Sequence, residues 1–173
     1  MKPSLIVKAL VLGVALLLSI EASAADQQRH RKTLEGVPSI YVLVEDISAD
    51  LKQAGLSTAM LQTDAELRLR AAGIRVASEQ EFFSLPGSPY LYVVVTGIRD
   101  ATTAGRHLGY SAAVSIEFVQ YVRLERDLSI RGPATTWSVG NIVTGSTGEV
   151  IRESVRDLTD HFANLYLTAN PKR

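Results

Sequence analysis

Apolar and polar residues alternate along several stretches of this chain. Combined with β-branched and aromatic residues, the alternation predicts strands at residues 39–47, 74–76, 90–98, 110–124 and 134–144. In 110–124, Ala112, Val114, Ile116 and Phe118 fall on one face, as in a half-buried antiparallel strand. The segments 100–109 and 126–133 hold glycine, proline and charged residues, and we expect them to turn the chain.

Two other stretches have apolar residues at helical spacing. In the first, residues 57–72, Ser57 is a suitable N-cap and Gly73 a suitable residue to end the helix. Its predicted buried stripe contains Met60, Leu67, Ala71 and Ile74. In the second, residues 149–169, one continuous stripe predicts a buried face made of Ile151, Val155, Leu158, Phe162, Leu165 and Ala169.

A shorter helical turn is predicted between these two helices. Ser78 and Glu81 have the spacing of a capping box, in which each residue satisfies a backbone N–H group of the other. Phe82 and Phe83 follow directly, before the loop Leu85–Pro89.

The order β-α-β-β-β-β-α predicts an α+β fold. Helices with one apolar stripe and strands with one apolar face must cover each other. We therefore expect a two-layer sandwich, with both helices on one face of a largely antiparallel sheet of four to five strands. Val42, Leu91, Val93, Ala112 and Val114 are then predicted to point inward.

The opposite face of this sheet is the candidate binding site. Its predicted residues are Tyr41, Leu43, Tyr90, Tyr92, Val94, Val119 and Tyr121. Tyrosine offers a large contact area together with a hydroxyl group, and it is enriched in protein interfaces. We expect Tyr41, Tyr90, Tyr92 and Tyr121 to contact a partner. The alternative is that tyrosine and valine are there only because they are good strand formers.

The N-terminal residues predict export. Lys2 and Lys8 precede a short apolar run at residues 9–20, and Ala22-Ser23-Ala24 provides the small residues of a signal-peptidase site. We expect a signal peptide at residues 1–24, a flexible N-terminal arm at 25–36 and a single α+β domain at 37–173. The protein is accordingly predicted to be periplasmic in a bacterium, without stable membrane insertion after cleavage.

Composition narrows the chemistry. The 173 residues include no cysteine, which excludes disulfides, thiolate catalysis and cysteine-ligated metals. The formal net charge is zero, so we expect no nucleic-acid partner. No catalytic motif or paired metal-ligand spacing occurs, which predicts no enzymatic activity, no catalytic residue, no metal and no cofactor. Several basic residues lie near expected strand ends and could meet an anionic envelope component: Arg99, Arg106, His107, Arg123, Arg126 and Arg131.

Four segments together resemble a family of small, uncharacterised exported bacterial proteins. They are ELRLRAAGI at 66–74, PYLYV at 89–93, TWS at 136–138 and FANLYLTANP at 162–171. At the level of fold, the chain is also similar to the amino-terminal domain of periplasmic TolB and to small α/β domains of envelope-assembly accessory proteins. These resemblances imply a binding role and carry no catalytic residue.

The sequence leaves two functions open. The first is a protein-interaction module of the cell envelope that binds an envelope protein through the outer sheet face or a sheet edge. The second is a binding protein for a small amphipathic or anionic envelope ligand, held between sheet and helices near Val114 and Phe118. The pattern of residues determines neither the strand order nor the oligomeric state.

Overall fold

The computed structural model describes residue 28 and residues 31–101 and 105–171. The predicted signal peptide lies outside these residues. The strands are β1 (Tyr41–Val44), β2 (Tyr90–Ala101), β3 (His107–Leu124) and β4 (Asp127–Gly145). The helices are α2 (Ala49–Gln53), α3 (Thr58–Ala71), α4 (Glu79–Phe82) and α5 (Glu149–Ala169).

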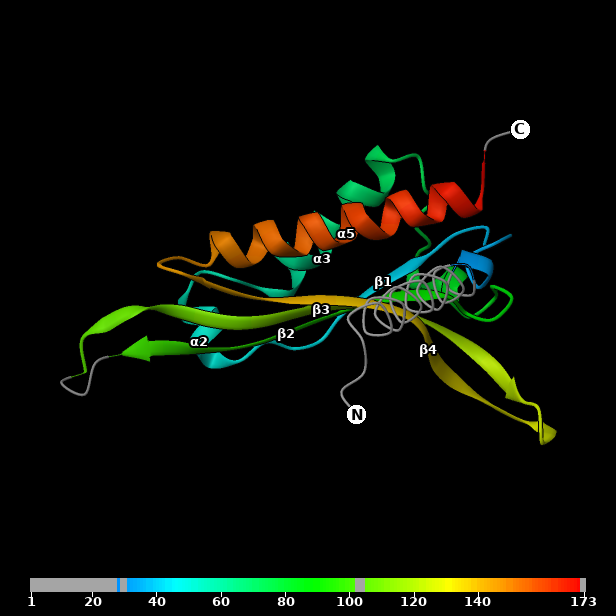
Figure 1. The fold of residues 1–173 in the computed structure, drawn as a ribbon, viewed down its shortest axis with the longest axis horizontal. Coiled ribbons are helices and arrows are strands. Elements are labelled where there is room, and N and C mark those ends of the chain that lie inside the picture. Colours follow the sequence, from blue (N-terminus) through cyan, green and yellow to red (C-terminus); the bar gives the residue numbers. More distant parts are fainter. Residues whose placement is uncertain (1–27, 29–30, 102–104, 172–173) are drawn as a thin grey trace, which may run out of the picture.

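The strands form one sheet in the order β1-β2-β3-β4. β1 runs parallel to β2, with Tyr41 beside Tyr90, and the other two pairings are antiparallel. The long helices α3 and α5 lie together on the same side of the sheet (Figure 1). The expected α+β sandwich is therefore confirmed, with four strands.

Local capping chemistry sets the ends of α3. The Ser57 hydroxyl accepts a hydrogen bond from the backbone N–H of Met60, as expected of an N-cap. Gly73 has a φ of +78°, and the N–H of Ile74 donates to the carbonyl of Leu69 to close the last turn. Both ends of this helix follow the prediction.

The predicted buried face of α3 is wrong except at Ile74, which is 3% exposed. Leu61, Ala65 and Leu69 are fully buried, whereas Leu67 is 56% exposed. Leu61, Ala65 and Leu69 are spaced four residues apart and belong to the core, where α3 contacts α5 and β1. The helix carries apolar residues on two stripes, so the choice between them depends on where α5 and β1 lie rather than on spacing alone.

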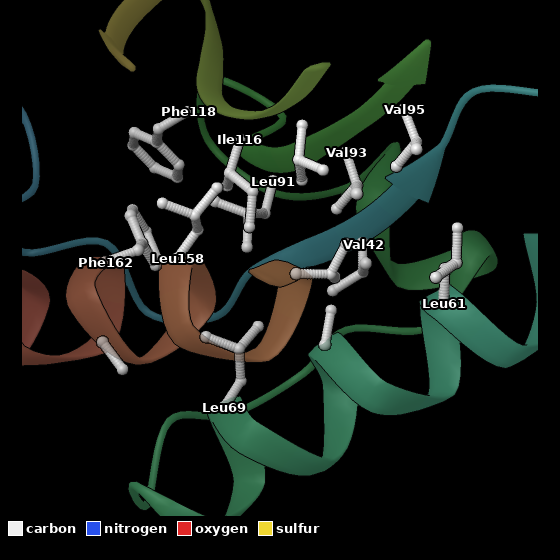
Figure 2. Close-up of a cluster of buried hydrophobic side chains, with 14 of the residues drawn as sticks. Val42, Leu61, Leu69, Leu91, Val93, Val95, Ile116, Phe118, Leu158 and Phe162 are labelled. Carbon is white, nitrogen blue, oxygen red and sulfur yellow. The ribbon is translucent and has the colours of Figure 1, made fainter. Parts of the chain in front are cut away.

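The core lies between the sheet and the two long helices. Figure 2 shows side chains of the strands, among them Val42, Leu91 and Ile116, pointing toward Leu158 of α5 and Leu69 of α3. The five residues predicted to point inward are buried: Val42, Leu91, Val93, Ala112 and Val114. The stripe of α5 is buried from Ile151 to Phe162, and Tyr166 continues it near the C-terminal end.

The hairpin formed by β3 and β4 is longer than predicted. Residues 126–133 were expected to turn the chain, but β4 already begins at Asp127 and pairs with β3 through Pro133. Pro133 is tolerated because β4 is an edge strand. The hairpin projects away from the helices at one end of the molecule (Figure 1). The expected strand at 74–76 is instead a single parallel bridge between Val76 and Ile40.

The described part of the predicted N-terminal arm, residues 31–36, packs against the domain. Leu34 is fully buried in the core. The side chain of Asn170 accepts from the N–H of Gly36 at 2.8 Å and donates to the carbonyl of Leu34 at 2.9 Å. A single apolar residue in a polar segment produces no periodic pattern, so its burial could not be predicted from the sequence. The prediction of a flexible arm is corrected for residues 31–36.

Candidate functional site

Aromatic rings gather on the face of the sheet opposite α3 and α5. The ring of Phe82 lies 5.2 Å from that of Tyr41 and 5.7 Å from that of Tyr90. Tyr92 lies 6.2 Å from Tyr90, and Phe83 lies 5.1 Å from Phe82. These are the distances of favourable aromatic pairs. We call these residues, Tyr41, Phe82, Phe83, Tyr90 and Tyr92, the aromatic surface.

The parallel pairing of β1 and β2 positions the tyrosines of this surface. Tyr41 and Tyr90 are register partners, and Tyr92 stands opposite Leu43 in the next outward-facing row. Because side chains alternate along a strand, these residues point away from the core formed by Val42 and Leu91. Three of the four predicted site residues, Tyr41, Tyr90 and Tyr92, are thus brought together.

The capping box positions Phe82. The Ser78 hydroxyl accepts from the N–H of Glu81, and the Glu81 carboxylate accepts from the N–H of Ser78 at 2.9 Å. The Glu81 carboxylate also forms an ion pair with Arg75. Hydrogen bonds from the backbone and hydroxyl of Ser78, together with the charge of Arg75, lower the pKa of Glu81. These contacts hold the single turn α4, from which Phe82 reaches the tyrosines.

Tyr121 has a different setting from the other three tyrosines. Its N–H donates to the carbonyl of Gly87 at 2.7 Å, which holds it near the beginning of β2. The guanidinium of Arg131 lies 4.9 Å from the centre of its ring, a cation–π contact. Tyr121 is 41% exposed. It therefore extends the site toward the β3–β4 hairpin.

Acidic residues border the aromatic surface. Burial raises the pKa of the Tyr41 hydroxyl, and the nearby charges of Glu79 and Glu66 raise it further. Burial likewise raises the pKa of Tyr90, with contributions from Tyr121 and Glu117. The hydroxyls of Tyr41 and Tyr90 therefore stay neutral at physiological pH, beside carboxylates that would complement a basic partner.

The rest of the predicted outer face is partly as expected. Leu43 is 40% exposed, and Ile98 and Ile142, which lie on the same face by alternation, are 62% and 80% exposed. Val119, however, is only 5% exposed, although it was expected to point outward. It stands between Tyr90 and Thr135 in neighbouring strands, which leaves it little access to water.

Sequence reasoning missed the part of Phe82 and Phe83 in the site. Phe83 is 74% exposed, the largest exposure of an aromatic side chain among the described residues. The available signal was the capping box, which begins a single helical turn, followed by two consecutive phenylalanines before a loop. Phe82 is half-buried against Tyr41 and Tyr90, whereas Phe83 is exposed beside it, and an exposed aromatic side chain next to such a cluster is typical of a contact surface.

A charged cluster joins α3 to α5. The Asp64 carboxylate accepts from Arg152 Nε at 2.8 Å and from Arg152 Nη2 at 3.0 Å. Arg156 Nη2 lies 3.3 Å from the same carboxylate, and Glu149 pairs with both arginines on the side nearer to solvent. Burial alone would raise the pKa of Asp64, but the hydrogen bonds and charges of Arg152 and Arg156 outweigh it and lower that pKa. This cluster fastens the two helices together.

The space between sheet and helices is filled where the alternative function would place a ligand. Val114 is 1% exposed and Phe118 is fully buried. The ring of Phe118 lies 5.4 Å from that of Phe162, which in turn lies 5.2 Å from Trp137. A ligand bound between the layers would have to displace these core side chains.

Two other kinds of feature are absent from the described residues. No group of three or more histidine, aspartate or glutamate side chains there is arranged to hold a metal ion. Within the same residues, no helix has both the length and the apolar character needed to cross a membrane. His161, the histidine on the flank of α5, stacks on Trp137 with the rings 6.0 Å apart.

Comparison with known proteins gives only distant likenesses. No known family and no curated protein matches the chain. A solved dodecamer of PelC from Paraburkholderia phytofirmans is similar at 18% identity and a TM-score of 0.45, over 72% of this chain and 89% of that chain. A neuraminyllactose-binding hemagglutinin homolog from Helicobacter pylori is similar at 10% identity and a TM-score of 0.33, over 75% and 83%. Rare lipoprotein B from Shewanella oneidensis is similar at 15% identity and a TM-score of 0.26, over 75% and 92%. These likenesses are too distant to transfer a function, and the expected similarity to the TolB domain stays a prediction.

Proposed function

We propose that this chain is a non-enzymatic protein-binding domain of the bacterial cell envelope, exported to the periplasm, whose partner binds the aromatic surface. The observation that carries the proposal is the set of ring contacts that joins Phe82 to Tyr41 and Tyr90 on the outer face of the sheet. The location rests on the signal peptide predicted at residues 1–24.

The chemistry of this surface favours a protein partner with basic residues. Aromatic rings with exposed edges supply apolar contact area at a small cost in side-chain entropy. Glu79 and Glu117 lie close enough to Tyr41 and Tyr90 to raise their pKa values, so this part of the rim is acidic, whereas Arg131 lies at the part near Tyr121. A partner segment that combines apolar side chains with lysine or arginine would complement both features.

Site-specific photo-crosslinking in cells tests the proposal. A photoreactive residue is placed at Phe83 (74% exposed), and a matched control is placed at Ile142 (80% exposed), on the same face of the sheet beyond the aromatic surface. We expect a discrete crosslinked protein from position 83 and not from position 142. Tyr92→Ala in the same background should abolish this crosslink, whereas Thr96→Ala should leave it unchanged.

Two results would refute the proposal. One is equal crosslinking from positions 83 and 142, which would mean that the contacts are unspecific. The other is a crosslink that persists in Tyr92→Ala while thermal unfolding shows the variant to be folded. The alternative of a ligand between the layers predicts the reverse pattern, with sensitivity to Phe118→Ala and none to Tyr92→Ala.

A further inference from the structure

The end of the β3–β4 hairpin, residues 121–133, carries two opposite chemical faces. We call this segment the hairpin tip. Its strands are paired from Tyr121 opposite Pro133 to Leu124 opposite Asp127. Beside the Arg123–Arg131 pair, alternation places Val122 of β3 and Ile130 of β4 on one face of the ribbon. Leu124 and Leu128 follow them toward the turn, where the register shifts between Arg123 and Leu124. This face is a continuation of the side of the sheet that α5 covers elsewhere.

The apolar face of the hairpin tip is exposed to solvent. Leu124 is 37% exposed, Leu128 63% and Ile130 42%. The tip diverges from α5 (Figure 1), so the helix that buries the same face of β3 nearer its centre does not reach these residues. Large aliphatic side chains gathered at the end of a protrusion are typical of a surface that enters another apolar environment.

The opposite face of the hairpin tip is cationic. Arg123 and Arg131 are direct cross-strand partners, and like charges in such a pair destabilise a sheet. Arg123 Nη1 donates to the carbonyl of Leu128 at 2.7 Å, and Arg131 lies over the ring of Tyr121. These partners are a backbone carbonyl and an aromatic ring, so neither arginine has its charge neutralised by them. An anion between them would relieve the repulsion.

The turn itself carries further charges. Arg126 adds a third positive charge, while Glu125 and Asp127 are negative. The Asp127 carboxylate accepts from the N–H of Ser129 at 3.0 Å and from its hydroxyl at 2.7 Å, and these bonds lower its pKa. The tip thus keeps a positive excess, concentrated on the face of Arg123 and Arg131.

We propose that the hairpin tip binds peripherally to an anionic lipid surface. A protein partner that docks on one side of this two-stranded ribbon would cover either the apolar face or the cationic face and leave the other exposed. The interfacial region of a bilayer surrounds an inserted tip and supplies acyl chains to Leu128 and Ile130 and phosphate groups to the arginines. The proposal goes beyond the protein-binding role of the aromatic surface, and it does not depend on that role.

The absence of cysteine makes a local test possible. A single cysteine introduced as Leu128→Cys in the full chain carries an environment-sensitive fluorophore at one defined position. Ile142→Cys, on the same strand but outside the tip, is the matched control. We expect a blue shift at position 128, and quenching by brominated acyl chains, with vesicles of phosphatidylglycerol and phosphatidylcholine. Vesicles of phosphatidylcholine alone should give a much weaker response.

Charge variants complete the test. Arg123→Gln combined with Arg131→Gln should weaken the lipid affinity reported by position 128 about 30-fold, because each arginine near an anionic surface strengthens binding roughly fivefold. Arg106→Gln, at the other end of the sheet, should have no effect. The proposal is overturned if position 128 gives no shift, if position 142 shifts equally, or if the double arginine variant binds as well as the parent while remaining folded. A shift that requires added envelope protein and does not occur with lipid alone would also overturn it.

Discussion

Replacing Asp64 with asparagine should destabilise the domain in a pH-dependent way. The Asp64 side chain is only 10% exposed and receives both Nε and Nη2 of Arg152, with Arg156 Nη2 at 3.3 Å. Removing the charge leaves two arginines, each about one-quarter exposed, without their buried counter-ion. Asparagine has nearly the same shape, so the change tests charge rather than packing.

The magnitude follows from the contacts that are lost. Breaking a buried ion pair by removing one partner costs about 3–5 kcal/mol. Here both arginines keep their contacts with Glu149 at 2.8–2.9 Å and retain some water, so a loss of about 2 kcal/mol in the free energy of unfolding is expected. With a slope of about 2 kcal/mol per molar of urea, the unfolding midpoint falls by about 1 M.

The pH dependence supplies the decisive measurement. The pKa of Asp64 is lower in the folded protein than its ordinary value, so its contribution is fully present above about pH 4 and is lost as the pH falls through the folded-state value. Urea unfolding of the parent and of Asp64→Asn should therefore differ near neutral pH and converge in acid. Asp157→Asn, on the exposed side of α5, is the control and should change stability by less than about 0.5 kcal/mol. Equal losses in the two variants, or a difference that persists unchanged in acid, would refute the reasoning.

Three further predictions concern stability, and urea unfolding measures each of them. Gly97→Ala should lower the free energy of unfolding by about 1–3 kcal/mol, because the added Cβ would lie 2.9 Å from the Cβ of Ala112. The control Gly132→Ala, with open space around it, should be nearly neutral, and equal effects of the two changes would contradict this reasoning. Phe118→Ala should cost about 3–5 kcal/mol because the ring is fully buried, and a loss below about 1 kcal/mol would show that the core is not packed as described. Ser57→Ala should cost about 1 kcal/mol through the lost N-cap, while no change would mean that the hydrogen bond contributes nothing.

The features that the sequence predicts correctly are those with local causes. The N-cap Ser57, the ending residue Gly73 and the capping box of Ser78 and Glu81 depend on hydrogen bonds between residues close in the chain. The boundaries of α5 follow equally well, since Gly148 precedes its apolar stripe and Pro171 follows Asn170. Alternation also assigned the inward face of the sheet.

The features that were mispredicted depend on contacts between distant segments. Whether Leu67 or Leu69 is buried is decided by the position of α5, which the spacing within α3 does not encode. The same applies to Asp64, whose arginine partners are 88 and 92 residues away in sequence. Of the candidate site, the tyrosines could be predicted from alternation, but the ring contacts made by Phe82 required the fold of the loop between α4 and β2.

The hydrogen bonds of Asn170 have a consequence for the order in which the protein can fold. This residue holds Leu34 and Gly36 from positions more than 130 residues earlier, so the two ends of the domain meet through one side chain. A polypeptide that emerges from a ribosome or a secretion channel with its N-terminus first completes this contact last. The contact between the two ends of the domain therefore cannot form until residue 170 has been delivered.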